Sequence, residues 1–201
     1  MQRIGIIGGS FNPIHVAHVV IANQFANQLQ LDLCYFIPAY QSPFKAEEAT
    51  AANCEHRAVM VALAIEDYPK YKLSRIEIDR AEVSYTIDTV ASIKSSHPNA
   101  QLFLLIGTDQ AVVFDRWKDW QQICRLSQLC IVRRPCPTTA QSDDEITKHL
   151  TIDGVAPLWI DSPLSTISST DVRQRIKAGE STVHLLDERV AVYIAQHNLY
   201  K

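Results

Sequence analysis

An apolar run that leads directly into a glycine turn and then into a helix constrains the fold of this chain more than any other feature. Arg3–Ile7 (RIGII) has the pattern of a buried strand and is followed at once by Gly8 and Gly9. Apolar residues then recur at helical spacing along His15–Leu29, and a second short apolar run covers Leu33–Ile37. Strand, turn, helix and strand in this order predict two parallel strands joined by a crossover helix.

The alternation of strands and helices continues along the chain. Further helices are predicted over Cys54–Glu66, Tyr85–Lys94, Ser168–Lys177 and Asp187–His197, with a short one near Asp109. Further strands are predicted over Tyr71–Asp79, Gln101–Ile106, Gln128–Val132 and Pro157–Ile160, and a polar loop over Pro135–Asp144. We therefore expect an α/β, doubly wound fold: a mostly parallel sheet with helices on both faces, and a small C-terminal helical part over about residues 165–201. The length suits one domain over residues 1–201.

Composition and charge exclude several classes of partner. The chain of 201 residues is 47% hydrophobic and 20% charged, which is typical of a globular protein. Its formal net charge of −3 provides no general basic field, so we expect neither nucleic acid nor a membrane as partner. The first residues lack the apolar segment of a signal peptide, and no apolar stretch is long enough to span a bilayer. A cytoplasmic location is expected.

The cysteines fit this interpretation. Their number is odd and none are spaced as C-x-x-C, so reduced, mostly structural thiols are expected and no metal site is predicted. They are Cys34, Cys54, Cys124, Cys130 and Cys136.

The segment between the first strand and the first helix has the makings of an anion site. Gly8 and Gly9 let the backbone turn tightly and approach a ligand, and the helix start offers free N–H groups. His15 and His18 are three positions apart and share one face of the first turn, where imidazoles can donate to phosphate oxygens. The same pair could instead bind a metal, or cap and pack the helix. The dinucleotide fingerprint G-x-G-x-x-G does not fit.

A second cluster of donors follows the last predicted strand. Ser168 or Ser169 is a good N-cap for the next helix, and Thr170 and Arg173 lie on one face of it. Hydroxyls, free N–H groups and a guanidinium fork there suit one phosphate group. Taken alone, the segment is better interpreted as an ordinary capped helix with a solvated arginine.

Together the two segments resemble the signatures of the nucleotidyltransferase superfamily. Gly8–His18 is similar to G-G-x-F-[DN]-P-x-H-x-G-H, with Ala17 where that family usually has glycine, and Ile167–Arg173 is similar to I-S-S-T-x-x-R. Members of the superfamily are Rossmann-like enzymes that transfer a nucleotidyl group from a nucleoside triphosphate to a phosphate. The resemblance implies catalytic roles for His15, His18 and Arg173, and ATP contacts from Gly8, Gly9, Ser10, Phe11, Ser168, Ser169 and Thr170.

Two further positively charged residues are assigned by resemblance alone. Pro38–Lys45 (PAYQSPFK) is similar to the P-x4-P-x-K loop, which implies that Lys45 reaches phosphate as a catalytic residue. Arg133 matches an arginine near the ATP phosphates, although its neighbour Arg134 is an equal candidate. The C-terminal segment Val190–Tyr200 also resembles the closing helix of the family.

The middle of the chain resembles one branch, the nicotinate-mononucleotide adenylyltransferases. Ser84–Thr89 (SYTIDT) is similar to the S-Y-T-x-D-T segment that lines the pyridine pocket of that family, which implies substrate contacts from Ser84, Tyr85 and Thr86. Gly107–Trp120 is similar to the G-x-D…W…W stretch, which implies that Asp109 lies near ribose hydroxyls and Trp117 near the pyridine ring. An indole face stacks well on such a ring. Trp117 and Trp120 could also be plain helix packing, and Trp120 is assigned to the core.

The implied reaction transfers AMP from ATP to nicotinate mononucleotide, releasing pyrophosphate and forming nicotinate adenine dinucleotide, a step of NAD biosynthesis. Mg²⁺ is expected to accompany ATP. Two alternatives stay open: an adenylyltransferase for another acceptor, such as nicotinamide mononucleotide or phosphopantetheine, and a nucleotide-binding module without turnover. A homo-oligomer is one of the assemblies that the sequence allows.

Overall fold

Six parallel strands make one sheet in the computed structural model, which describes residues 1–43, 52–133, 142–163 and 166–201. The order across the sheet is β3-β2-β1-β4-β5-β6, and every neighbouring pair is parallel. The strands are β1 (Arg3–Gly9), β2 (Leu33–Pro38), β3 (Tyr71–Leu73), β4 (Gln101–Gly107), β5 (Gln128–Val132) and β6 (Leu158–Ile160). The predicted parallel, doubly wound α/β fold is confirmed.

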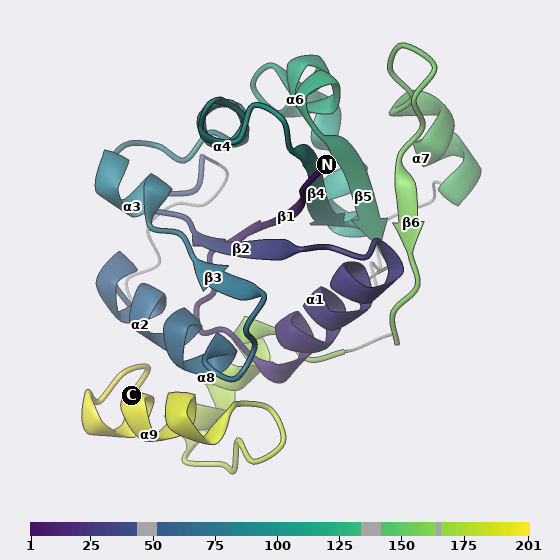
Figure 1. Cartoon of the computed structure of the whole chain (residues 1–201). Coiled ribbons are helices and arrows are strands. Elements are labelled where there is room, and N and C mark those ends of the chain that lie inside the picture. The colour runs from purple at the N-terminus through teal and green to yellow at the C-terminus, as the bar shows by residue number, and fades with distance from the viewer. Residues whose placement is uncertain (44–51, 134–141, 164–165) are drawn as a thin grey trace.

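Helices cover both faces of this sheet (Figure 1). One face packs against α1 (Val16–Gln28), α2 (Cys54–Ile65), α8 (Ser169–Ala178) and α9 (Glu188–Gln196). The other packs against α4 (Thr86–Ser96), α5 (Thr108–Ala111), the 3₁₀ turn η1 (Phe114–Arg116), α6 (Trp120–Leu126) and α7 (Asp143–His149). A short helix, α3 (Ile76–Arg80), follows β3. Alternate residues of each strand enter opposite cores, as Ile6 and Ile7 do, because side chains of a strand alternate between faces.

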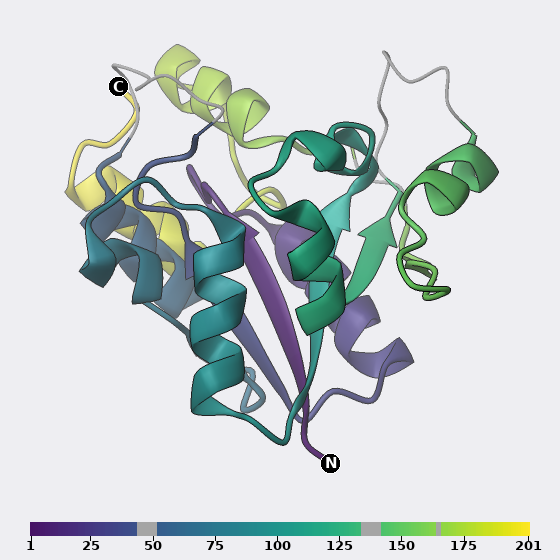
Figure 2. The ribbon, with the colours of Figure 1, turned by 90° about the horizontal axis from the view of Figure 1, so that it is seen from above.

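The strand order creates a switch point between β1 and β4. The chain moves outward from β1 through β2 to β3, and then returns to place β4 on the other side of β1. Loops leaving β1 and β4 therefore diverge, and such a crevice at the carboxyl ends of strands is where open α/β sheets bind ligands. Figure 2 shows β1 running toward the side of the molecule where α8 lies.

Gly5 lets α1 and β2 pack closely around β1. A Cβ atom on Gly5 would lie 2.7 Å from Cys34 Sγ and Leu31 Cδ1, and 2.8 Å from Phe25 Cε1. These three side chains are buried in the core on the α1 face. The absence of a side chain at this one strand position thus fixes how closely the helix that carries the histidines approaches the sheet.

Two sequence predictions are wrong in part, and one helix was not predicted. The strand predicted over Tyr71–Asp79 ends at Leu73, and α3 takes its place from Ile76, because two apolar residues in five fit a short helix as well as a strand. Asp143 and Asp144 lie in α7 rather than in a loop, since Ser142 and Glu145 form a capping box at its start. Residues 135–141 of the predicted loop lie outside the described residues. Helix α6 has no counterpart among the predictions.

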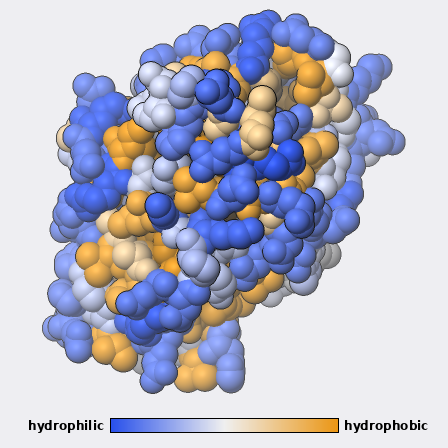
Figure 3. All heavy atoms as spheres, viewed as in Figure 1, coloured by the Kyte–Doolittle hydropathy of each residue, from blue (hydrophilic) through white to orange (hydrophobic). Residues whose placement is uncertain are grey.

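The surface is mixed in character. On the face shown in Figure 3, apolar groups are interspersed with polar ones. The exposed large apolar side chains of the described residues come from several elements, for example Val20 on α1, Val59 on α2 and Val192 on α9. None of the helices described in the structure combines the length and apolarity that a membrane crossing requires.

Candidate active site at the carboxyl edge of the sheet

The loop after β1 fixes the orientation of two histidines. His15 is the N-cap residue of α1 and is buried, and its backbone N–H donates a hydrogen bond to His18 Nδ1 at 3.2 Å. The two rings lie 3.7 Å apart, centroid to centroid. Because Nδ1 of His18 accepts, the proton of its neutral ring sits on Nε2. The arrangement therefore presents an N–H donor from the first turn of α1.

Phe11 packs against the histidine pair through the His18 ring. Its backbone lies in the left-handed region (φ 44°), and its buried ring meets the His18 ring edge-on at 5.2 Å. A Cβ on Gly9 would lie 3.3 Å from Phe11 Cζ, whereas a Cβ on Gly8 would meet nothing within 4 Å. Gly9 thus makes room for the Phe11 ring. Ala17 is buried within an unbroken α1, so the helix accommodates its methyl group.

The structure brings the second motif onto the loop of the first. Ser169 Oγ donates to the carbonyl of Pro13 at 2.9 Å, and Arg173 Nη1 donates to the carbonyl of Asn12 at 2.9 Å. Arg173 Nη2 also lies 3.5 Å from Thr170 Oγ1. The N-cap predicted at this helix is confirmed as Ser168, whose hydroxyl accepts from the backbone N–H at position 171. Two segments far apart in sequence therefore line one region.

Asn12 also binds the C-terminal segment around Tyr200 to the loop after β1. Its side-chain oxygen accepts from the Tyr200 hydroxyl at 2.8 Å and from the Ala52 backbone N–H at 3.3 Å. Asn12 and Tyr200 are both buried, and burial raises the pKa of the Tyr200 hydroxyl, which keeps it a donor. No separate role was predicted for either residue from the sequence.

The residues predicted to contact the mononucleotide lie at the start of α4 and directly after β4. Tyr85 is the N-cap of α4 and Thr86 its first residue, and the Lys118 ammonium lies 4.6 Å from the centre of the Tyr85 ring. Asp109 stands in α5, directly after β4. Its Oδ2 accepts from Gln110 Nε2 at 2.9 Å, while its buried Oδ1 has no hydrogen-bond partner among the residues that the structure describes. A carboxylate oxygen in that state suits a hydroxyl donor.

The two tryptophans pack beside these residues. Trp117 is partly buried against the core on the α4 face, with its ring 5.0 Å from that of Phe114. Trp120 is partly buried in the same core, in agreement with its assignment to packing.

A buried carboxylate braces the start of α4. Glu77 of α3 accepts from Thr89 Oγ1 at 2.7 Å and also from the Ser84 hydroxyl. Burial raises its pKa above the ordinary value, while the two hydroxyl donors and Arg80 act in the opposite direction. Two residues of the SYTIDT segment thus hold a carboxylate that the sequence analysis did not single out.

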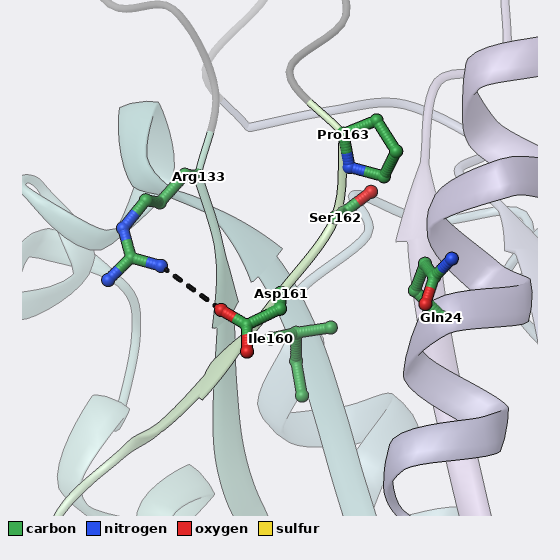
Figure 4. Close-up of a pocket in the computed structure, with 6 residues that line it drawn as sticks. All are labelled: Gln24, Arg133, Ile160, Asp161, Ser162 and Pro163. Carbon is green, nitrogen blue, oxygen red and sulfur yellow. Dashed lines mark ion pairs between the residues drawn. The ribbon is translucent and has the colours of Figure 1, made fainter.

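Arg133 lines a cavity between α1 and the ends of β5 and β6 (Figure 4). Its guanidinium pairs with Asp143 at 2.7 Å and with Asp161 at 3.5 Å, and lies 5.0 Å from the centre of the Trp159 ring. The cavity has a volume of about 290 Å³ and is lined by Gln24, Arg133, Ile160, Asp161, Ser162 and Pro163. Arg133 is therefore held at the carboxyl edge by two carboxylates. Lys45 and Arg134 lie outside the described residues.

Sequence reasoning missed one buried cation altogether. Arg57 of α2 is 7% exposed, and its guanidinium donates to the carbonyls of Ser10, Tyr40 and Ala52. The signal was present, because an arginine on the buried side of an apolar helix needs partners. Within the described ranges, no group of three or more His, Cys, Asp or Glu side chains is arranged to hold a metal ion.

Comparison with known proteins gives a consistent result. The cytidylyltransferase-like family model matches residues 6–175. A "probable nicotinate-nucleotide adenylyltransferase" of Lactiplantibacillus plantarum is 38% identical over 100% of this chain and 89% of its own length. A protein of the same name from Enterococcus faecalis is 37% identical over 100% of this chain and 85% of its own.

Solved structures agree on the fold. The Plasmodium falciparum nicotinic acid mononucleotide adenylyltransferase complexed with NaAD superposes with a TM-score of 0.81 at 21% identity, covering 100% of this chain and 98% of that one. A putative nicotinate-nucleotide adenylyltransferase from Vibrio parahaemolyticus gives a TM-score of 0.71 at 17% identity, covering 100% and 96%. The family model and the full-length similarity in sequence place the chain in the cytidylyltransferase-like family and, within it, among the nicotinate-nucleotide adenylyltransferases.

Proposed function

We propose that this protein transfers the AMP part of ATP to nicotinate mononucleotide, which yields nicotinate adenine dinucleotide and pyrophosphate. The observation that carries the proposal is the meeting of the two motifs: Ser169 and Arg173 bond to the carbonyls of Pro13 and Asn12, next to the histidine pair. Hydroxyl, guanidinium and imidazole donors at a strand end and at two helix starts favour a polyphosphate.

Chemistry follows from the protonation of the reactants. The phosphate of the mononucleotide is already ionised at neutral pH, so its oxygen can attack the α-phosphorus of ATP in line without a strong general base. The phosphorus–oxygen bond to pyrophosphate breaks as the new one forms. Catalysis then consists of positioning the two phosphates and stabilising charge on the transferring group.

Roles follow from the donors at hand. Nε2–H of His18 donates to an α-phosphate oxygen, and His15 holds the orientation of that ring through its backbone N–H. Arg173 holds the polyphosphate and the departing pyrophosphate, with Lys45 as its proposed partner. The N–H groups at the start of α8 and the Thr170 hydroxyl add neutral donors, while Ser169 holds the loop in place through its hydrogen bond to the Pro13 carbonyl.

The acceptor occupies the other side of the switch point. Asp109 accepts hydrogen bonds from ribose hydroxyls through Oδ1, which has no partner within the described part of the chain. The pyridine ring lies near Trp117 and the start of α4, where backbone groups of Tyr85 and Thr86 meet its carboxylate. Mg²⁺ would accompany ATP as part of the substrate and would offset the negative charge of its phosphates. We place the reaction in the cytoplasm.

Pyrophosphate release tests the proposal directly. The protein is supplied with ATP and Mg²⁺ and, in separate reactions, nicotinate mononucleotide, nicotinamide mononucleotide or phosphopantetheine. We expect turnover much faster with the nicotinate compound. Turnover only with phosphopantetheine would leave the ATP side intact and overturn the acceptor. ATP binding without release in any reaction would make the protein a binding module.

A further inference from the structure

A single buried guanidinium joins three loop segments at the carboxyl edge. Arg57 Nη1 donates to the Ser10 carbonyl at 2.7 Å, Nη2 to the Tyr40 carbonyl at 3.2 Å, and Nε to the Ala52 carbonyl at 3.2 Å. Ser10 belongs to the loop after β1 and Tyr40 to the chain after β2. The planar fork of arginine reaches several acceptors in one geometry, which a lysine ammonium cannot reproduce.

The connection continues from Tyr40 to the acceptor side. The backbone N–H of Tyr40 donates to Ser84 Oγ at 3.0 Å, and the Ser84 N–H donates to the carbonyl of Gln41 at 2.9 Å. Gln41 also forms a parallel bridge with Val83. Ser84 immediately precedes the N-cap of α4, so the start of that helix is tied to the peptide that Arg57 holds.

Burial of this charge calls for an explanation beyond packing. Placing a guanidinium in the interior costs free energy, and an apolar side chain fills space at lower cost. Desolvation lowers the pKa of Arg57, whereas Cys54, Tyr200 and Glu77 act in the opposite direction. All three of its hydrogen bonds end on backbone carbonyls of loops, two of which lead to opposite halves of the site.

We infer that Arg57 is a positioning residue that sets the distance between the ATP-side loop at Ser10 and the acceptor-side segment at Ser84, acting through Tyr40. The inference rests on the proposed function, because it takes the two sides to hold the two reacting phosphates. Each side keeps its own ligand contacts; Arg57 determines how the two are placed relative to each other.

Transfer and binding respond differently to such a residue. In-line attack needs the reacting atoms about 3–3.5 Å apart, and a misplacement of about 1 Å costs roughly 10²-fold in rate. Binding of either substrate alone uses only one side. The dinucleotide product occupies both sides at once, so its affinity gains from correct spacing as a linked ligand does.

The test compares Arg57→Lys with Arg75→Lys as matched control. Arg75 contacts the same helix α2 through an exposed pair with Glu55, at 2.8 and 3.0 Å, and lies outside the proposed site. For Arg57→Lys we expect kcat to fall about 10–100-fold and the dinucleotide to bind at least about tenfold more weakly. The dissociation constants of a non-hydrolysable ATP analogue and of nicotinate mononucleotide, each measured alone by calorimetry, stay within about threefold. Arg75→Lys leaves all four values unchanged.

Equal weakening of all three ligands, in step with a lower thermal midpoint, would reduce Arg57 to a structural role and overturn the inference. So would an unchanged kcat. Arg57→Gln provides a second variant if Arg57→Lys folds poorly, because its neutral amide carries two N–H donors and cannot reach all three carbonyls at once. The same pattern, with kcat and dinucleotide affinity reduced together, supports the inference; weakened mononucleotide binding with normal kcat contradicts it. Failure of the wild type to release pyrophosphate would instead overturn the proposed function.

Discussion

The hydroxyl of Tyr200 donates a buried hydrogen bond to the side-chain oxygen of Asn12, although 188 positions separate the two residues. The backbone carbonyl of Asn12 also accepts a hydrogen bond from the Arg173 guanidinium. A loop that leaves the first strand is thereby held by α8 and by the segment that follows α9, and its shape depends on both.

Loss of this hydroxyl should destabilise the fold. Tyr200→Phe leaves the Asn12 oxygen with only the Ala52 N–H at 3.3 Å as its described partner. We expect the free energy of unfolding to fall by about 1–2 kcal/mol, as for other buried hydrogen bonds. Urea denaturation measures it. Tyr35→Phe, at a partly buried tyrosine packed beside His97, is the control and should change stability by less than about 0.5 kcal/mol. Equal effects of the two variants would contradict the role of the hydrogen bond.

Removal of the proposed α-phosphate donor should affect the rate rather than the fold. His18→Ala is expected to reduce kcat about 10²–10³-fold, the usual cost of losing a donor to a developing charge. Steady-state pyrophosphate release measures kcat, and circular dichroism verifies folding. His97→Ala, at the end of α4, serves as control. A folded His18→Ala protein with near-normal turnover would show that the role is misassigned.

Arginine geometry should matter at position 173. Arg173→Lys keeps the charge but loses the fork that bonds to the Asn12 carbonyl and faces the proposed polyphosphate. We expect kcat/KM for ATP to fall about 10–100-fold, with KM for the mononucleotide little changed. Arg175→Lys controls for a general effect of the exchange, because Arg175 pairs with the half-buried Asp171 on the same helix and with Glu180. A comparable loss in both variants would count against the assignment.

Gly5 should tolerate no side chain. In Gly5→Ala the new methyl would stand 2.7 Å from Cys34 Sγ and Leu31 Cδ1, so strand or helix must shift. Overpacking of this kind costs about 1–3 kcal/mol. Gly8→Ala is the matched control for stability, because a Cβ there meets nothing within 4 Å. Thermal or urea unfolding measures the stability of the two variants. Similar stabilities would mean that α1 can shift away from β1 at little cost and would contradict the prediction.

Buried thiols predict a loss of stability in alkali. Burial raises the pKa of Cys34 from 9.0 to about 12, so the native state keeps this proton while the unfolded chain releases it above pH 9. Stability is thus fully present below pH 9 and declines as pH rises toward the folded value. Linkage gives a loss of about 1.3 kcal/mol between pH 8 and pH 10 for this group alone. Urea unfolding under reducing conditions measures the slope, which should be smaller in Cys34→Ala; an unchanged slope would contradict the assignment to Cys34.

The fold was predictable where hydrophobic periodicity was long and was missed where elements were short. The runs that became β1, β2, β4 and β5 carry enough apolar residues to define buried parallel strands. Helices α3, α6 and α7 have only five to seven residues each, and too few of them are buried for a period to emerge.

The site divides in a similar way. His15, His18 and Arg173 lie in local motifs, so their spacing was visible in the sequence, and the structure brings them near one loop. Arg57 and Tyr200 act on partners far away in sequence, and the partners of Arg57 are backbone carbonyls, which leave no side-chain pattern. Such contacts become visible only when the chain is folded.

The distant hydrogen bonds that Arg173 and Tyr200 donate to Asn12, and Ser169 to the adjacent Pro13, also bear on when the protein becomes competent. Contacts across such separations close large loops and are slow to form. A nascent chain can pair β1 with β2 early and can bond Arg57 to Ser10, yet the loop after β1 lacks its contacts to Arg173 and Tyr200 until those residues have been made. We therefore expect the protein to gain competence for AMP transfer only after the segment around Tyr200 has been synthesised and has folded onto Asn12.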